Sequence, residues 1–407
     1  MPYKITLGPN GVDYPKFKWL REDAKSYLYK LDSDNKWGRL PYLDERPLVE
    51  IEQGDNLPPR VVAIDLHTNQ KNVVLDPNPG FLTRHRFARA TPIEWKYGNG
   101  RKATALLYWP PDYIPGQRYP LVVQGHGYRP DIFEPWGAVR ERRQVAQVIA
   151  NSGIFVVQYD EAVDGWGQSK WDTYEGTAFS ALEMLIDTLD KRGVVDREKV
   201  GLAGYSTEYG FFLHFVSHSK YPIVTIAIGE GADWGYFSFL SVYAGWSVGI
   251  YGAGTSREQL NGGLPWGTSQ ETWLQRSPGF NLDRIKTPIQ FEVGTSENYP
   301  EAMAPGMGLT SLLMVWENYQ GLRLLGRPVE LNLLPAATHD GGPPWSTFAS
   351  QQNAVDWIRF WLQGHERTTP IMDVGETNEE LAEKYFRWRV MREKQNKGKA
   401  IPASANK

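Results

Sequence analysis

The sequence predicts an α/β protein with a mostly parallel, doubly wound sheet flanked by helices, preceded by a small β-rich segment. Two observations predict this class. From about Thr91 onward, short apolar runs alternate with longer stretches of helical periodicity. Several of the runs, such as PLVVQG and GIFVVQY, are continuously apolar. Continuous apolar strands are typical of a parallel sheet that helices cover on both faces.

Composition and charge exclude several classes of protein. The chain has 407 residues, of which 41% are apolar and 22% charged, so it is long and apolar enough to bury a large core. The net charge of −3 gives no electrostatic basis for binding nucleic acid or an anionic membrane surface. No apolar run reaches the roughly 18–20 residues that span a bilayer. The absence of Cys excludes disulfides and thiolate chemistry.

The chain divides into three expected regions. Residues 1–84 are a β-rich N-terminal segment, in which RVVAIDLHTNQKNVVLD is expected to form a hairpin. Residues 85–370 are the α/β domain. Within it, residues 230–284 are rich in Gly, Trp and Tyr and have weak periodicity, as expected of a lid-like excursion. Residues 371–407 are expected to form a polar C-terminal helix and tail.

The α/β domain is expected to alternate eight strands with five helices. The expected strands are 93–97, 103–109, 120–124, 154–159, 200–204, 223–228, 289–293 and 329–334. The expected helices are 138–151, 174–191, 207–219, 309–321 and 347–363.

Ser206 is the candidate nucleophile. It follows the fifth expected strand in the order Gly204-Tyr205-Ser206, and the chain passes directly from it into a helix. This is the context of a nucleophile elbow, a strained turn that exposes the serine Oγ. The next backbone N–H, that of Thr207, then points into the oxyanion hole. The pattern usually has a small residue two positions after the serine, where this chain has Glu208.

A general base and an acid follow in the order that this kind of site requires. His339 lies in a loop after the last expected strand, which makes it the candidate base. Glu297 lies just past the seventh strand and is the candidate acid, since a carboxylate there would hold the imidazole and stabilise the imidazolium. Asp160, Glu230 and Asp233 follow other strands and remain alternative acids.

A glycine-rich turn and several aromatic residues complete the candidate site. The turn after the third strand contains Gly127 and Tyr128, whose backbone N–H groups are expected to join Thr207 in the oxyanion hole. Trp234, Tyr236 and Tyr205 are the candidate substrate-binding residues. We expect no metal site and no cofactor, because a Ser–acid–His triad supplies nucleophile, base and electrostatics by itself.

These motifs together resemble the prolyl oligopeptidase family of serine peptidases, within the α/β-hydrolase superfamily. The resemblance extends from about Phe87 to Gly364 and includes YPLVVQGHG, the Gly-x-Ser elbow, PIQFEVGTSE and AVDWIRFWLQG. Lasso-peptide isopeptidases of the same group are similar and have Glu at the acid position. The resemblance implies an α/β-hydrolase fold, with the N-terminal β-rich segment as a propeller-blade remnant.

The resemblance also implies a function. The expected activity is hydrolysis of peptide or isopeptide bonds through a Ser206–Glu297–His339 triad and an acyl-enzyme. Two alternatives remain open: an esterase acting on acylated sugars or other esters, and a non-catalytic hydrolase-fold binding protein, which Glu208 motivates. The expected partner is a peptide or small ester substrate, and the sequence leaves the oligomeric state open. The absence of a visible signal peptide favours the cytoplasm, or the periplasm or secretion if a leader has been removed.

Overall fold

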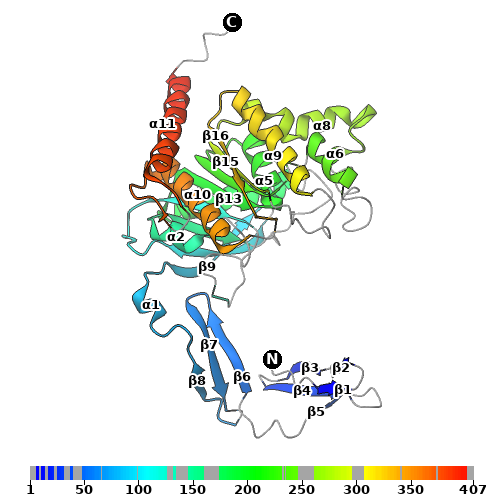
Figure 1. Ribbon diagram of the computed structural model, residues 1–407, viewed down its shortest axis with the longest axis vertical. Helices are drawn as coiled ribbons and strands as arrows, with labels where there is room; N and C mark the ends of the chain where they lie inside the picture. The colour runs from blue at the N-terminus through cyan, green and yellow to red at the C-terminus, as the bar shows by residue number, and fades with distance from the viewer. Residues whose placement is uncertain are drawn as a thin grey trace. The chain divides into compact units, whose positions relative to one another are not determined.

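The structure is a computed structural model, and it divides the chain into two units (Figure 1). Unit 1 comprises Met1–His85 and Asp131–Phe133, and unit 2 comprises Arg86–Pro130 and Glu134–Lys407. The described residues are 6–8, 11–13, 17–22, 25–31, 37–39, 48–65, 67–98, 100–125, 132–133, 145–159, 174–231, 233, 235–245, 261–295, 307–339, 342–372 and 375–400.

Unit 1 contains small antiparallel sheets. The strands are β1 (Thr6–Gly8), β2 (Gly11–Asp13), β3 (Phe17–Glu22), β4 (Lys25–Leu31), β5 (Trp37–Arg39), β6 (Leu48–Gly54), β7 (Leu57–Ile64) and β8 (Lys71–Leu75), followed by the short helix α1 (Phe81–Arg84). They pair as β1-β2, β3-β4-β5 and β6-β7-β8.

The expected hairpin is formed by β7 and β8, which pair antiparallel. Asp65 closes the turn between them, because one of its carboxylate oxygens accepts the backbone N–H groups of His67 and Thr68 at 2.8 and 3.0 Å. Asn69 takes a positive φ of 56° in the same turn, a conformation that Asn tolerates better than most residues.

Unit 2 is built on a mixed sheet of eight strands in the order β16-β15-β14-β13-β11-β12-β10-β9. The strands are β9 (Arg89–Tyr97), β10 (Arg101–Trp109), β11 (Tyr119–Gln124), β12 (Phe155–Tyr159), β13 (Val195–Tyr205), β14 (Thr225–Gly229), β15 (Ile289–Gly294) and β16 (Val329–Leu334). Strands β9 and β10 run antiparallel to their neighbours, and β11 to β16 are parallel to one another. The predicted α/β-hydrolase class, with a mostly parallel sheet, is confirmed.

Helices cover both faces of this sheet (Figure 1). The longer helical elements are α2 (Ala146–Asn151), the π-helical turn η2 (Tyr174–Phe179), α4 (Ser180–Lys191), α5 (Thr207–His218), α6 (Tyr236–Gly245), α8 (Gln270–Arg276), α9 (Met307–Leu324), α10 (Pro344–Gln363) and α11 (Asn378–Ala400); the short 3₁₀ turns are η3 (Gly267–Ser269), η4 (Pro278–Phe280) and η5 (Leu282–Arg284). Helices α4, α5 and α9 pack in one core, and α2, α10 and α11 pack in the other.

Alternation along the strands separates the two cores. On β13, Val200 and Leu202 belong to the core with α5, whereas Ala203 belongs to the core with α10. Both sets are almost fully buried. Neither face of the sheet meets water, and the strands are therefore continuous apolar runs in the sequence.

Helix α11 is polar in composition, but one side of it is buried and apolar. Leu381, Tyr385 and Trp388 are buried along one side of it, and the Trp388 ring packs against Trp357 of α10 at 5.1 Å between centroids. Many of the charged residues of the same helix, such as Glu379, Glu383 and Arg387, are exposed. The expected C-terminal helix is therefore present, and it packs on the core through an apolar stripe formed by Leu381, Tyr385 and Trp388.

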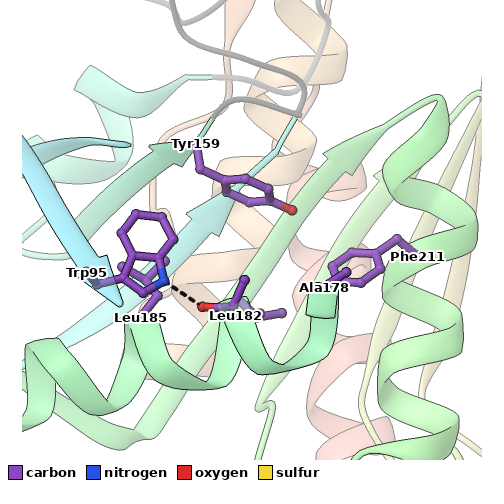
Figure 2. Close-up of a pocket in the computed structure, with 7 residues that line it drawn as sticks. Trp95, Tyr159, Ala178, Leu182, Leu185 and Phe211 are labelled. Carbon is purple, nitrogen blue, oxygen red and sulfur yellow. Dashed lines mark hydrogen bonds between the residues drawn. The ribbon is translucent and has the colours of Figure 1, made fainter. Parts of the chain in front are cut away.

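A small apolar pocket lies inside the core with α4 (Figure 2). Trp95, Tyr159, Leu182 and Phe211 are among its lining residues, and the Trp95 indole N–H donates to the Ala181 carbonyl at 2.9 Å. Its walls are almost entirely carbon, and no charged residue lines it. We interpret it as a packing defect of the core.

Within the described part of the chain, no helix is long and apolar enough to cross a membrane.

Candidate active site

Ser206 lies at the turn between β13 and α5, as the motif predicts. It has φ 58° and ψ −111°, and α5 begins at the next residue, Thr207. Its backbone N–H donates to the carbonyl of Gly229, the last residue of β14, at 3.1 Å. A non-glycine residue in this strained backbone region is uncommon and typical of functional sites. The strand–turn–helix context of a nucleophile elbow is therefore present.

Two glycines make room for the bulky Glu208. A Cβ on Gly204 would lie 2.6 Å from the Glu208 Cβ, and one on Gly125 would lie 2.4 Å from its Cγ. Glu208 itself is fully buried in the first turn of α5, where the helix dipole favours a negative charge. The departure from the usual small residue is thus accommodated by glycines on two neighbouring strands, and the elbow keeps its shape.

His339 lies at the same carboxyl edge of the sheet as Ser206, after β16, which is three strands away from β13. Strand β16 ends at Leu334, and a turn with Ala336 at φ 58° leads to the histidine. The His339 Nε2 lies 3.2 Å from the Ser206 Oγ, within hydrogen-bond distance. The nucleophile and the base that the sequence predicts therefore lie in contact, and their catalytic roles stay a prediction.

Tyr205 packs against the histidine. Its ring centroid lies 4.8 Å from that of His339, with the planes tilted by 38°, and only 4% of Tyr205 is exposed. The observed contact is therefore with the imidazole, and the substrate contact expected for Tyr205 stays a prediction.

Glu230 presents a carboxylate to the other nitrogen of the same imidazole. Its Oε2 lies 3.8 Å from the His339 Nδ1, and its side chain is fully buried. The other oxygen, Oε1, accepts the backbone N–H of Gly294 at the end of β15. Among the described residues, none hydrogen-bonds to the His339 Nδ1.

The other acids have different positions. Glu297 and Asp160 lie outside the described residues. Asp233 is buried and accepts the backbone N–H of Gly235 at 2.9 Å and the hydroxyl of Ser238. Of the four candidate acids, Glu230 is thus the one that the described residues bring to His339. The sequence signal for Glu230 is its position just after an expected strand, which the other three candidate acids share.

The predicted oxyanion and substrate residues are described in part. Gly127, Tyr128 and Trp234 lie outside the described residues. Thr207 begins α5, which leaves its backbone N–H at the helix start as the elbow requires. The Tyr236 ring is half-buried at the start of α6, 6.5 Å from Trp266 and 6.3 Å from Phe280 between centroids.

The described parts of the expected lid-like excursion are packed. The rings of Phe239 and Trp273 lie 4.9 Å apart, both nearly fully buried, and the Trp273 indole N–H donates to the Gly263 carbonyl at 3.0 Å. These aromatics act as core for α6 and α8. Residues 246–260 of the excursion lie outside the described part.

A polar cluster of Asp233, Glu317 and Asn318 lies around Tyr209 of α5. The amide N–H₂ of Asn318 lies within hydrogen-bond distance of both Asp233, at 3.3 Å, and the Tyr209 hydroxyl, at 3.4 Å. Burial and the charge of Asp233 raise the pKa of Glu317 to about 8. Burial also raises the pKa of Tyr209 well above its usual value. The raised pKa favours the neutral form of the half-buried Glu317 carboxyl at neutral pH.

No family model matches the chain. The chain is similar to a lasso peptide isopeptidase. That relative, AtxE2 of Asticcacaulis excentricus, is 26% identical over 349 residues, which are 82% of this chain and 45% of the relative.

The solved structures agree on the fold. The AtxE2 isopeptidase has a TM-score of 0.67 at 23% identity, covering 91% of this chain and 55% of that one. The Pyrococcus horikoshii acylaminoacyl peptidase has a TM-score of 0.59 at 14% identity, covering 88% and 56%. These are peptidases of the prolyl oligopeptidase type, so the predicted resemblance is confirmed. The chain spans about half the length of the relatives it matches.

Proposed function

We propose that the chain is a serine peptidase that hydrolyses peptide or isopeptide bonds. The observation that carries the proposal is the contact between the Ser206 Oγ and the His339 Nε2 at 3.2 Å, made at a strained elbow on an α/β-hydrolase sheet. A hydroxyl held against an imidazole at such an elbow is the arrangement of nucleophilic acyl transfer. The similarity to a lasso peptide isopeptidase supports an amide as the bond cleaved.

In the proposed reaction, Ser206 attacks the carbonyl carbon of the scissile amide while its hydroxyl proton passes to the His339 Nε2. The resulting oxyanion is held by the backbone N–H of Thr207 and by those of Gly127 and Tyr128. His339 then gives its proton to the departing amine, which leaves an acyl-enzyme on Ser206. Water, deprotonated by His339, hydrolyses this ester and restores the serine. Glu297 is proposed as the acid that orients the imidazole.

The same chemistry cleaves a linear peptide bond and an isopeptide bond, because both are amides of a carboxyl and an amine. Substrate shape therefore decides between them. The structure of the AtxE2 relative with astexin3-dC4 bound makes that peptide the first substrate to test. We propose a peptide partner of this kind for the present chain.

The experiment combines active-site labelling with three substrates. We expect a fluorophosphonate probe to label the parent at Ser206, and Ser206→Ala to lose both labelling and about 10⁶-fold in kcat. Ser152→Ala, at a serine just after α2 whose hydroxyl donates to the Val148 carbonyl of that helix, is the control and should match the parent. Astexin3-dC4, a linear peptide of the same sequence and p-nitrophenyl acetate then separate isopeptidase, peptidase and esterase.

Each outcome bears on the proposal. Cleavage of either peptide by the parent, with Ser206 labelled, supports it. Turnover of the ester with neither peptide cleaved would make the protein an esterase. A parent that neither labels nor turns over any of the three would be a hydrolase-fold binding protein.

A further inference from the structure

We propose that Glu230 is a positioning residue of the catalytic site, supplying a fixed buried negative charge to His339 in addition to the acid Glu297. This inference rests on the proposed serine peptidase activity. Four neighbouring parallel strands end at the candidate active site. Strands β13, β14, β15 and β16 are consecutive in the sheet, and their carboxyl ends meet at one edge. Ser206, Glu230, Gly294 and His339 lie there, one from each strand.

The backbone of Glu230 is held from two sides. Its N–H donates to the carbonyl of Glu292 on β15 at 3.1 Å, and the preceding carbonyl, that of Gly229, accepts the N–H of Ser206. Glu230 has a φ of 55°, which is costly for a residue with a long side chain. The chain thus accepts backbone strain at a residue directly between the nucleophile elbow and the next strand.

The following residue tightens this arrangement. A Cβ on Gly231 would lie 2.3 Å from the Ser206 carbonyl oxygen and 2.3 Å from the Tyr209 Cβ. Only glycine allows the backbone to lie this close to the elbow. Residues 229–231 are therefore packed directly on the turn that presents Ser206, and the Glu230 side chain starts from a fixed position.

From this fixed backbone, the Glu230 side chain extends toward the His339 imidazole. One carboxylate oxygen accepts the Gly294 N–H, and the other lies 3.8 Å from the His339 Nδ1. The opposite imidazole nitrogen lies 3.2 Å from the Ser206 Oγ. Carboxylate, imidazole and hydroxyl therefore follow one another in the order that a proton relay between serine and histidine needs.

The separation of 3.8 Å defines the role. It is within ion-pair distance but beyond a normal hydrogen bond, so Glu230 acts through its charge more than by selecting a tautomer. When Nε2 takes the serine proton, the imidazole becomes positive, and a carboxylate at this distance away from water stabilises it. The Gly294 N–H stabilises the charged form of the carboxyl in turn.

The alternative is a purely structural glutamate that only anchors Gly294. Glu230→Gln separates the two, because the amide oxygen still accepts the Gly294 N–H while the charge is lost. We expect kcat for the peptide that the parent cleaves to fall about 100-fold, with KM within about threefold, less than the roughly 10⁴-fold loss when a hydrogen-bonded triad acid is neutralised. Glu330→Gln is the matched control: Glu330 is a buried glutamate of β16 whose carboxylate accepts the Trp388 indole N–H, and kcat should be unchanged.

A second pair of variants guards against a folding defect. Asp and Asn both tolerate a positive φ and have nearly the same shape, so Glu230→Asp and Glu230→Asn differ chiefly in charge. The Asp variant should exceed the Asn variant in kcat by about tenfold or more, since charge is the quantity at stake. Equal kcat values for the two, or a folded Glu230→Gln with the parent's kcat, would overturn the inference. A parent that labels at Ser206 and cleaves peptide in those same assays leaves the proposed function intact; a parent that does neither overturns both.

Discussion

Replacing Gly231 with alanine places a methyl group against the nucleophile elbow. The new Cβ would lie 2.3 Å from two atoms, the Ser206 carbonyl oxygen and the Tyr209 Cβ, where real contacts are essentially never under 3.0 Å. The first of these belongs to the nucleophile itself, and the second to the first turns of α5. Neither is the flexible end of a side chain, so the backbone of the elbow has to move.

The size of the effect follows from this geometry. Relief of the overlap needs a displacement of about 0.7 Å, and shifts near 1 Å in a catalytic group cost about 10²-fold in rate. Overpacking of this kind also costs about 1–3 kcal/mol in the free energy of unfolding. We therefore expect Gly231→Ala to lower kcat by about 100-fold and to lower the melting temperature by several degrees.

The assay is kcat on the peptide that the parent cleaves, with thermal unfolding measured on the same samples. Gly54→Ala is the control, since no atom lies within 4 Å of the Cβ built there. It should change neither kcat nor, beyond about 1 kcal/mol, the free energy of unfolding. A Gly231→Ala variant with the parent's kcat and the parent's melting temperature would refute the packing described for the elbow.

Two further predictions concern stability. Burial and the charge of Asp233 raise the pKa of Glu317 to about 8, so the folded state holds this proton in a pH range where the unfolded chain releases it. The resulting stability is fully present below the ordinary value of 4.5 and is lost as pH rises toward 8. Glu317→Gln, which is always neutral, should therefore gain stability relative to the parent between about pH 5 and pH 9 in urea unfolding; a difference independent of pH would contradict this. Trp388→Ala removes a fully buried ring that packs on Trp357 and should cost about 3–5 kcal/mol, whereas Phe386→Ala, exposed on the same helix, should cost less than about 0.5 kcal/mol; equal melting temperatures would show that α11 is not fastened by its apolar stripe.

The sequence by itself determined the fold class and the Ser206–His339 pair. The strands and helices were readable because each depends on a local pattern: a run of apolar residues for a buried strand, an apolar period for a helix. Ser206 was recognisable for the same reason, since strand, serine and helix are adjacent in the chain. His339 followed from its place after the last strand, because the carboxyl ends of parallel strands meet at one edge of the sheet.

Only the tertiary structure decided which described carboxylate faces the imidazole. Four acidic residues follow strand ends, and the sequence favours Glu297 from its place after the seventh strand and from the family resemblance. The contact between Glu230 and His339 joins residues more than one hundred positions apart and depends on the lateral order of β14, β15 and β16 and on a strained φ. Neither the lateral order of the strands nor the strained φ of Glu230 produces a pattern in the residues around Glu230.

The space for Glu208 is likewise decided by tertiary structure. In the sequence alone, a large residue at this position departs from the usual elbow motif. In the fold, Gly125 from the end of β11 and Gly204 from β13 lie against it and leave the space that its side chain fills. The compensating residues lie on neighbouring strands, with Gly125 about eighty positions away in the chain, and only packing across the sheet brings them to Glu208. Local patterns specify which elements form, whereas complementary side-chain volumes and charges between distant elements are specified by how those elements are arranged.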